Sequence, residues 1–407
     1  MKKVFLLTMS VLLVVSLYAR TGLYRLVIKA DPSYNMTIGW VQFSGKDTKV
    51  FFDTRENYRK TGKLSHVASD VTYIRHRGLN NGFVTLSGLK PGTEYVFKVE
   101  DNNSSSRLFS FYTIANGDNV RLSVVAGGDS RTNRNIRRMA DKMVSKLQPD
   151  FVIFDGDFTY SSSGKEWRRW LKDWQLTIRD GRLIPILVVP GNHERDEDVV
   201  KFFDLTDFPE GYYSVDIADN FLHFVSLNTQ YQIPGQQTEW FVNDLKKNQD
   251  AYWKIVAYHK PMRPHYSRKR EGDLQYKYWA KPIYKYDVSL VLEGDTHTCK
   301  TTWPIVPDST GYQGFTRDDA KGTVYVGEGC WGAPLRPADD IKPWTRDAES
   351  INQFKLLWID KDKIEIRTVK YENEAHVKPV SYQNRFTLPE GIDLWNPKNG
   401  EVIIIKH

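Results

Sequence analysis

Cysteine is nearly absent from this sequence of 407 residues, in which only Cys299 and Cys330 occur. Two cysteines are too few for a small scaffold held together by disulfides. They are also too few for a metal site built from thiolates, so any metal must be held by oxygen and nitrogen ligands. In an oxidising compartment the pair could form one bridge, and the sequence leaves this open because it does not place their Cβ atoms.

Long apolar runs are missing after the first 19 residues, so no membrane span is expected in the mature chain. At the start, Lys2 and Lys3 precede an apolar stretch over residues 4–17, and Ala19 is a small residue suited to cleavage. We predict a signal peptide over residues 1–19 and an exported protein, periplasmic or secreted. An uncleaved anchor is the alternative, but the stretch is shorter than the ~20 residues that span a bilayer.

Internal repeats and low-complexity tracts are absent too, which excludes a solenoid or a disordered chain. Hydrophobic residues make up 40% and aromatic residues 13% of the sequence, enough for packed cores. The length favours two domains. The formal net charge of +7 favours anionic partners but does not identify one.

Residues 21–115 show the pattern of an all-β domain. Short alternating runs over residues 36–40, 49–52 and 82–86 are separated by turn-forming residues. The segment 84–99 is typical of a sandwich corner, in which Tyr95 would lock a Pro-Gly turn. The segment resembles a fibronectin type III module and the N-terminal domain of plant purple acid phosphatases. Nothing in it indicates chemistry, so we interpret it as a spacer or lid.

Residues 120–407 alternate strand and helix patterns, which predicts an α/β layer fold. A helix is expected where apolar residues recur at helical spacing between positions 136 and 147, and a Trp-rich helix from about residue 166. A late hairpin is expected over 356–359 and 364–367. The expected strands cover residues 120–125, 151–154, 183–189, 253–258 and 288–292.

A polar cluster follows each of these five strands. The clusters are Gly127-Gly128-Asp129-Ser130-Arg131, Asp155-Gly156-Asp157-Phe158-Thr159-Tyr160, Pro190-Gly191-Asn192-His193-Glu194, Ala257-Tyr258-His259-Lys260-Pro261 and Glu293-Gly294-Asp295-Thr296-His297. Ligands of α/β sheets bind outside the carboxyl ends of the strands. Carboxylate, amide and imidazole groups at one edge suit hard or borderline metal ions.

The order of these clusters resembles the motif series of the calcineurin-like metallophosphoesterases, and Tyr160 matches the additional tyrosine of purple acid phosphatases. The resemblance implies a four-layer β-sandwich flanked by helices. It also implies two metal ions, iron paired with iron, zinc or manganese. The implied metal ligands are Asp129, Tyr160 and His297 for the first ion, Asp157 as the bridge, and Asn192, His259 and Asp295 for the second.

Two positions depart from the family pattern. Arg131 stands where the first motif usually has glycine, and it would either reach the substrate phosphate or brace the loop. Asp295 stands where the last motif usually has histidine. Aspartate is a competent ligand, but it adds negative charge and leaves open the identity of the second ion. A poorly metallated site is the alternative reading.

The resemblance implies hydrolysis by a water molecule that two ions activate for attack on phosphorus. His193 would contact the phosphate or the leaving oxygen. His265, followed by Glu271 as in related phosphatases, is the candidate acid for the leaving group. His193, His265 and Arg131 are therefore the predicted catalytic residues.

We therefore predict a phosphomonoesterase of the acid phosphatase type that acts on a phosphorylated small molecule or a phosphoprotein. A phosphodiesterase is the enzymatic alternative, and a surface binding protein with a relic metal site is the non-enzymatic one. No specific nucleic acid is predicted, because basic residues near His265 lack interleaved aromatics. The sequence does not indicate an oligomeric state.

Overall fold

The computed structural model describes residues 21–407, so the predicted signal peptide over residues 1–19 lies outside the described part. Within residues 21–407, no helix is long and apolar enough to cross a membrane. Cys299 and Cys330 are both buried, and neither forms a disulfide.

The N-terminal part is a β-sandwich, as the alternating runs predict. Its two layers enclose a core that includes Trp40 and Phe97. Tyr95 holds the corner as expected, because its hydroxyl accepts a hydrogen bond from the Lys90 amide at 2.9 Å. The elements are β1 (Thr21–Val27), β2 (Met36–Gln42), β3 (Lys49–Thr54), α1 (Arg55–Thr61), β4 (His66–Ala68), β5 (Thr72–His76), β6 (Leu79–Leu86), β7 (Glu94–Asp101), β8 (Ser104–Ser105) and β9 (Phe109–Tyr112).

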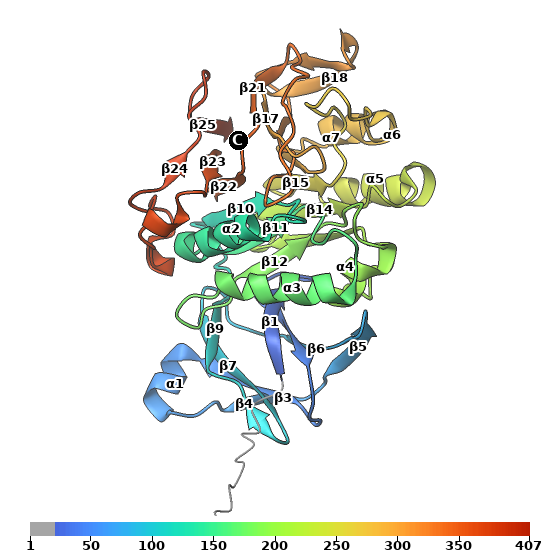
Figure 1. Cartoon of the computed structure of the whole chain (residues 1–407). Coiled ribbons are helices and arrows are strands. Elements are labelled where there is room, and N and C mark those ends of the chain that lie inside the picture. Colours follow the sequence, from blue (N-terminus) through green and yellow to red (C-terminus); the bar gives the residue numbers. More distant parts are fainter. Residues whose placement is uncertain (1–20) are drawn as a thin grey trace, which may run out of the picture.

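Two large sheets form the rest of the molecule (Figure 1). The first contains β10 (Leu122–Gly127), β11 (Phe151–Phe154), β12 (Pro185–Val188), β22 (Phe354–Ile359), β23 (Lys363–Lys370), β24 (Asp393–Leu394) and β25 (Val402–Lys406). The second contains β13 (Tyr213–Ile217), β14 (Leu222–Leu227), β15 (Trp253–Tyr258), β16 (Leu290–Glu293), β17 (Cys299–Thr302), β20 (Val324–Gly327) and β21 (Thr345–Glu349). A separate hairpin joins β18 (Ile305–Tyr312) and β19 (Phe315–Arg317).

Side chains that alternate along each strand explain how the sheets pack into layers. In β15, Ile255 and Ala257 face the core that the two sheets share, whereas Val256 and Tyr258 face a second core. This second core is completed by helical residues such as Phe241. Side chains of a strand point to opposite faces in turn, so a continuous apolar run predicts a strand buried on both sides. The layered α/β fold is therefore confirmed.

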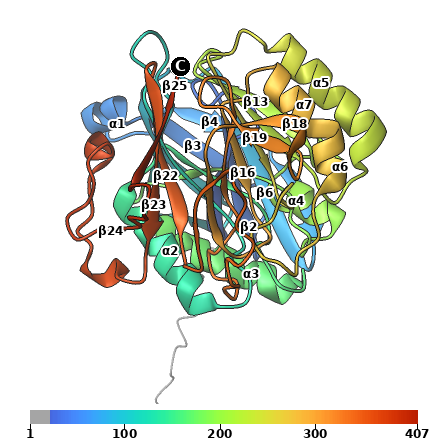
Figure 2. The same ribbon diagram turned by 90° about the horizontal axis from the view of Figure 1, so that it is seen from above.

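Helices cover the outer faces of the sheets, and Figure 2 shows α5, α6 and α7 gathered on one side of the molecule. Asn133 and Ser163 cap the two helices beside β10 and β11, because their side chains accept bonds from amides in the first turn. The helices are α2 (Arg134–Leu147), α3 (Gly164–Trp174), α4 (Asp196–Phe202), α5 (Thr238–Lys247), α6 (Asp273–Gln275) and α7 (Lys281–Lys285). Short turns are η1 (Gln175–Thr177), η2 (Ile233–Gln237), η3 (Tyr276–Ala280), η4 (Glu374–His376) and η5 (Tyr382–Asn384).

Strand β1 joins the two parts of the molecule into one sheet. It pairs antiparallel with β2 on one side and parallel with β12 on the other, in the register Leu26 to Pro185 and Val27 to Ile186. The first large sheet therefore runs from β24 through β12 to β5 without a break. The N-terminal domain is thus attached through backbone hydrogen bonds, and Figure 1 shows its strands directly beneath α3.

Candidate metal centre

The structure brings the predicted ligand residues together at the carboxyl ends of the strands. Asp129 follows β10, Asp157 follows β11 and His259 follows β15. β10 and β11 are parallel neighbours, and so are β15 and β16, which means that these strands of each sheet end at one edge. Asp129, Asp157, His259 and His297 are each at most 1% exposed.

Several of these residues have a strained backbone. Asp129, Asp157, Asp295 and His297 have φ angles of 57°, 55°, 65° and 60°, in the left-handed region that residues other than glycine rarely adopt. Such strain concentrates at functional sites, where the surrounding structure enforces it. Neighbouring glycines permit the crowding, since a Cβ on Gly191 would lie 2.1 Å from the Asp157 amide nitrogen.

The first metal position is formed by Asp129, Asp157 and His297, whose ligand atoms all lie within 4.8 Å of one another. Asp129 Oδ1 lies 3.1 Å from His297 Nε2 and, within residues 21–407, is a buried oxygen without a hydrogen-bond partner. His297 Nδ1 lies 2.8 Å from the Pro334 carbonyl oxygen. A carbonyl can only accept, so the proton is on Nδ1 and the Nε2 lone pair faces the carboxylates.

The second position has the same proton arrangement. His259 Nδ1 donates to the Asp155 carbonyl oxygen at 2.8 Å, so Nε2 faces the other donors and offers a lone pair when the ring is neutral. Asp157 Oδ1 and Asn192 Oδ1 both lie 3.2 Å from this Nε2, and Asp295 Oδ1 lies 3.9 Å from it. With a neutral imidazole these lone pairs converge without a proton between them and are stabilised by a cation, so the donor set fits a metal ion.

Tyr160 lies at the rim of this cluster. Its side chain is largely exposed, and its ring stacks on the His193 ring with centroids 5.4 Å apart. Within the described chain its hydroxyl makes no hydrogen bond to Asp129, Asp157 or His297. The structure therefore places Tyr160 beside the first position without engaging its oxygen.

The charged groups of the cluster shift one another's pKa values. Burial alone would lower the pKa of His259, but the carboxylates of Asp157 and Asp129 raise it well above its usual range. Burial would raise the pKa of Asp295, but the neighbouring His259 and Lys269 lower it. The site is thus a set of mutually stabilised charges, as expected where a cation is bound.

Two predicted catalytic residues lie at the cluster. The Arg131 Nε donates to Asp157 Oδ2 at 3.0 Å. The His193 amide donates to Asp157 Oδ1 at 2.9 Å, and the ring nitrogen Nε2 lies 3.9 Å from Asp157 Oδ2. The side chain of His193 is 24% exposed, so it can meet a ligand from solvent.

His265 does not join them. Its side chain is fully buried, with Nε2 2.7 Å from the Thr345 hydroxyl and Nδ1 3.6 Å from Glu328. Burial lowers the pKa of His265 and raises that of Glu271, which accepts a hydrogen bond from Gln313 at 3.1 Å. The structure gives no support to His265 as the acid for the leaving group, because spacing alone does not tell which way a loop side chain points.

Two residues outside the predicted site contact the predicted ligands. Glu194 accepts from the amides of Asp157 and Gly191 at 2.9 and 3.1 Å, and burial raises its pKa to about 8. Lys269 lies 2.5 Å from Asp295. The position of Glu194 directly after Asn192-His193 was the available signal. Nothing in the sequence pairs Lys269 with a residue 26 positions away.

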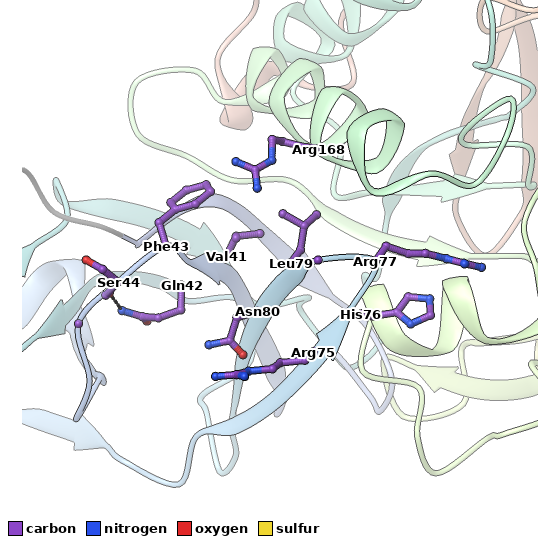
Figure 3. A pocket seen from close by; sticks show the side chains of 12 residues that line it. Val41, Gln42, Phe43, Ser44, Arg75, His76, Arg77, Leu79, Asn80 and Arg168 are labelled. Carbon is purple, nitrogen blue, oxygen red and sulfur yellow. Dashed lines mark hydrogen bonds between the residues drawn. The ribbon is translucent and has the colours of Figure 1, made fainter.

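A cavity of about 580 Å³ lies elsewhere, at the junction of the two domains, and none of the predicted site residues lines it. Figure 3 shows Arg168 on its α3 side and Arg75 on the β5 side. His76 and Arg77 in the same wall contact Asp198 at 2.5 and 2.9 Å. The metal centre is therefore separate from this cavity.

Two protein families match this chain. Residues 125–299 match the calcineurin-like phosphoesterases, and residues 24–113 match the purple acid phosphatase N-terminal domain. The first match begins within β10, contains the strands β11, β12, β15 and β16, and includes all the predicted ligands.

Relatives share about a quarter of their residues with it. Human acid phosphatase type 7 is 28% identical over 289 residues, which cover 62% of this chain and 64% of the relative. The chain therefore aligns with less than two thirds of that protein's length. Probable purple acid phosphatase 20 of Arabidopsis thaliana is 23% identical over 319 residues, 73% of this chain and 71% of the relative.

Solved structures share the fold. The purple acid phosphatase PPD1 from yellow lupin seeds superposes with a TM-score of 0.74 at 15% identity, over 95% of this chain and 74% of that one. The structure of PhoD superposes with a TM-score of 0.64 at 12% identity, over 94% of this chain and 91% of that one. The likeness covers both domains.

Proposed function

We propose that this chain, a member of the calcineurin-like phosphoesterases with a purple acid phosphatase N-terminal domain, hydrolyses phosphate esters with the help of bound metal ions. The observation that supports this most directly is the convergence of Asp157 Oδ1 and Asn192 Oδ1 on His259 Nε2, from which each lies 3.2 Å. Either a metal ion bound to the neutral imidazole or the Nε2 proton of a charged His259 stabilises that arrangement.

The proposed ligands follow the two positions described above. Asp129, Tyr160 and His297 would hold one ion, Asp157 would bridge, and Asn192, His259 and Asp295 would hold the other. Oxygen and imidazole donors suit iron, zinc or manganese, and we propose iron paired with one of these three metals. Bound ions of this kind polarise a phosphoryl group and make water a better nucleophile.

The chain's own residues would orient the substrate. His193 is half-buried and lies beside Asp157, so a phosphoryl oxygen at the centre would come within its reach. Positive groups near the equatorial oxygens stabilise the charge of the transition state, and Arg131 is one such group. Glu194 holds the loops of Asp157 and Asn192 in place through backbone amides.

The substrate is proposed to be a phosphate monoester of a small molecule or a phosphoprotein, hydrolysed in the periplasm or outside the cell. Diester hydrolysis is the second candidate. It is favoured by one relative, a probable glycerophosphodiester phosphodiesterase of Arcobacter nitrofigilis, which is 25% identical over 168 residues, 39% of this chain and 60% of the relative.

The test is metal analysis of the purified protein combined with hydrolysis of a monoester and a diester that share one leaving group. We expect bound metal, faster monoester cleavage, and loss of both metal and activity in Asp157→Asn. Asp319→Asn is the matched control, because Asp319 is exposed and contacts only Arg317. A protein that binds no iron, zinc or manganese and hydrolyses neither ester would contradict the proposal.

A further inference from the structure

Arg131 lies inside the first metal position. It comes two residues after Asp129, where the family pattern has glycine, and its side chain is 9% exposed. Its Nε donates to Asp157 Oδ2 at 3.0 Å, and its Nη2 lies 3.1 Å from His297 Nε2. One guanidinium therefore contacts two of the three groups that form this position.

The positions of the protons on His297 and Arg131 determine which group donates in these hydrogen bonds. His297 Nδ1 carries the ring proton, because it faces the carbonyl of Pro334, so Nε2 offers a lone pair. The guanidinium stays protonated and has only donors. Arg131 therefore donates into the lone pair of His297 Nε2 and into Asp157 Oδ2, the same two lone pairs that a metal ion would need.

The lone pair of His297 Nε2 cannot bind Arg131 and a metal ion at the same time. A metal ion sits about 2.0–2.2 Å from its nitrogen and oxygen ligands, along their lone pairs. His297 Nε2 has one lone pair, so a guanidinium that donates to it at 3.1 Å fills the direction along which an ion would bind, whereas Asp157 Oδ2 keeps a second lone pair. An ion can bind all three groups of the first position only when Arg131 leaves His297.

Charge balance supports the same conclusion. The carboxylates of Asp129, Asp157 and Asp295 face two cations, since Arg131 contacts Asp157 and Lys269 contacts Asp295. With His259 neutral, as a metal ligand must be, these groups leave a net charge near −1, which one divalent ion already exceeds. A second ion would enter a site that carries no remaining negative charge from these groups.

The second position has a weaker competitor. Lys269 contacts only Asp295 Oδ1, at 2.5 Å. Lys269 does not contact the other donors of this position, in which Asp157 Oδ1 and Asn192 Oδ1 each lie 3.2 Å from His259 Nε2. The two positions of this chain are therefore not equivalent.

We propose that Arg131 is a built-in competitor of the first metal ion, so that the chain holds one ion tightly at the second position. The first position fills only at higher metal concentration, when the guanidinium moves out. This inference rests on the proposed metal dependence and adds an ion-dependent position for Arg131. With one ion bound, the guanidinium supplies the second positive charge of the centre.

The test measures ion content and not activity. Wild type, Arg131→Gly and Arg131→Lys are stripped with a chelator and titrated with Mn²⁺ by calorimetry, and bound metal is counted by mass spectrometry. Arg169→Ala is the matched control, because Arg169 is an exposed arginine of α3 beside Tyr160. We expect one tight and one weak site in wild type and in the control.

In Arg131→Gly the weak site should tighten about tenfold or more, since its competitor's charge-assisted hydrogen bonds are gone. The affinity of the weak site in Arg131→Lys should lie between those of wild type and Arg131→Gly, because a lysine cannot donate to both groups in the same fixed geometry. Electron paramagnetic resonance at one Mn²⁺ per chain should show an isolated ion in wild type and a fraction of coupled pairs in Arg131→Gly.

Equal affinity at the first position in wild type and Arg131→Gly would overturn the inference while leaving the proposed function intact. No Mn²⁺ binding in any variant would contradict both. Thermal melting of each apoprotein checks the fold, and a variant that melts early is replaced by Arg131→Ala in the comparison.

Discussion

The Nζ atom of Lys269 lies 2.5 Å from Oδ1 of Asp295, with both side chains largely buried. Asp295 stands where the family pattern has a neutral imidazole, and the lysine compensates the charge that this substitution adds. The ion pair also holds a ligand oxygen that a metal ion would need.

Lys269→Ala should therefore tighten the second metal position, because Asp295 is released for coordination. We expect the dissociation constant for Mn²⁺ to fall about tenfold, as for the loss of one charge-assisted contact. Lys269→Arg keeps a cation and is the control. Calorimetric titration measures the effect, and weaker binding in Lys269→Ala would contradict it.

His193 and His265 should differ in their effect on catalysis. His193→Ala should lower kcat about 100-fold, since a positioned imidazole contributes about 10²–10⁴-fold. His265→Gln should change kcat far less, because His265 is buried against Thr345 and Glu328. Steady-state rates on a monoester decide this, once melting curves show that both variants are folded. A larger loss in His265→Gln would support the prediction that His265 is the acid for the leaving group.

Lys300 is the centre of a buried charge cluster behind the ligand loop. It contacts Glu293 and, at 2.8 Å, Glu328, and all three are at most 2% exposed. Lys300→Met should destabilise the fold by about 3–5 kcal/mol, because it leaves two buried carboxylates uncompensated. Lys378→Met removes only an exposed pair with Glu390 and should cost less than about 1 kcal/mol. Urea unfolding compares the two, and equal losses would contradict the prediction.

Asp141 should make stability depend on pH. Burial raises its pKa to about 7, above the ordinary value, even though Trp331 donates to it at 3.0 Å. A raised folded-state pKa contributes stability that is present below pH ~4 and is lost as the pH rises through 7. Asp141→Asn keeps an acceptor for Trp331, so its advantage over wild type should grow from pH 5 to pH 8, on the order of 2 kcal/mol. Urea midpoints across this range measure it, and parallel curves would contradict it.

Arg25 should couple the two domains. It is buried in β1, and it donates to the Phe202 carbonyl and to Asn81 Oδ1, both at 2.8 Å. Arg25→Ala should destabilise the protein by about 2–3 kcal/mol, since two buried acceptors lose a charged donor. Hydrogen exchange should rise first in β1 and β12, which pair across the junction. Unchanged hydrogen exchange in β1 and β12 would show that Arg25 does not couple the two domains.

Local patterns in the sequence determined much of this protein. Apolar runs such as 151–154 and 253–258 predict β11 and β15, because a strand buried on both faces must be apolar throughout. Polar residues directly after such strands predict a shared edge, because parallel strands end together. Tyr95 at its turn and the capped helix after Asn133 are likewise decided by residues a few positions apart.

Only the tertiary structure decided the contacts between distant segments. The pairing of β1 with β12 joins residues some 160 positions apart, and the pairing of Lys269 with Asp295 spans a loop whose course no pattern specifies. The direction of His265 and the insertion of Arg131 between Asp157 and His297 depend on how five strand ends pack around one another. Residue type sets which atoms can bind, but the packing of the whole chain sets which of them meet.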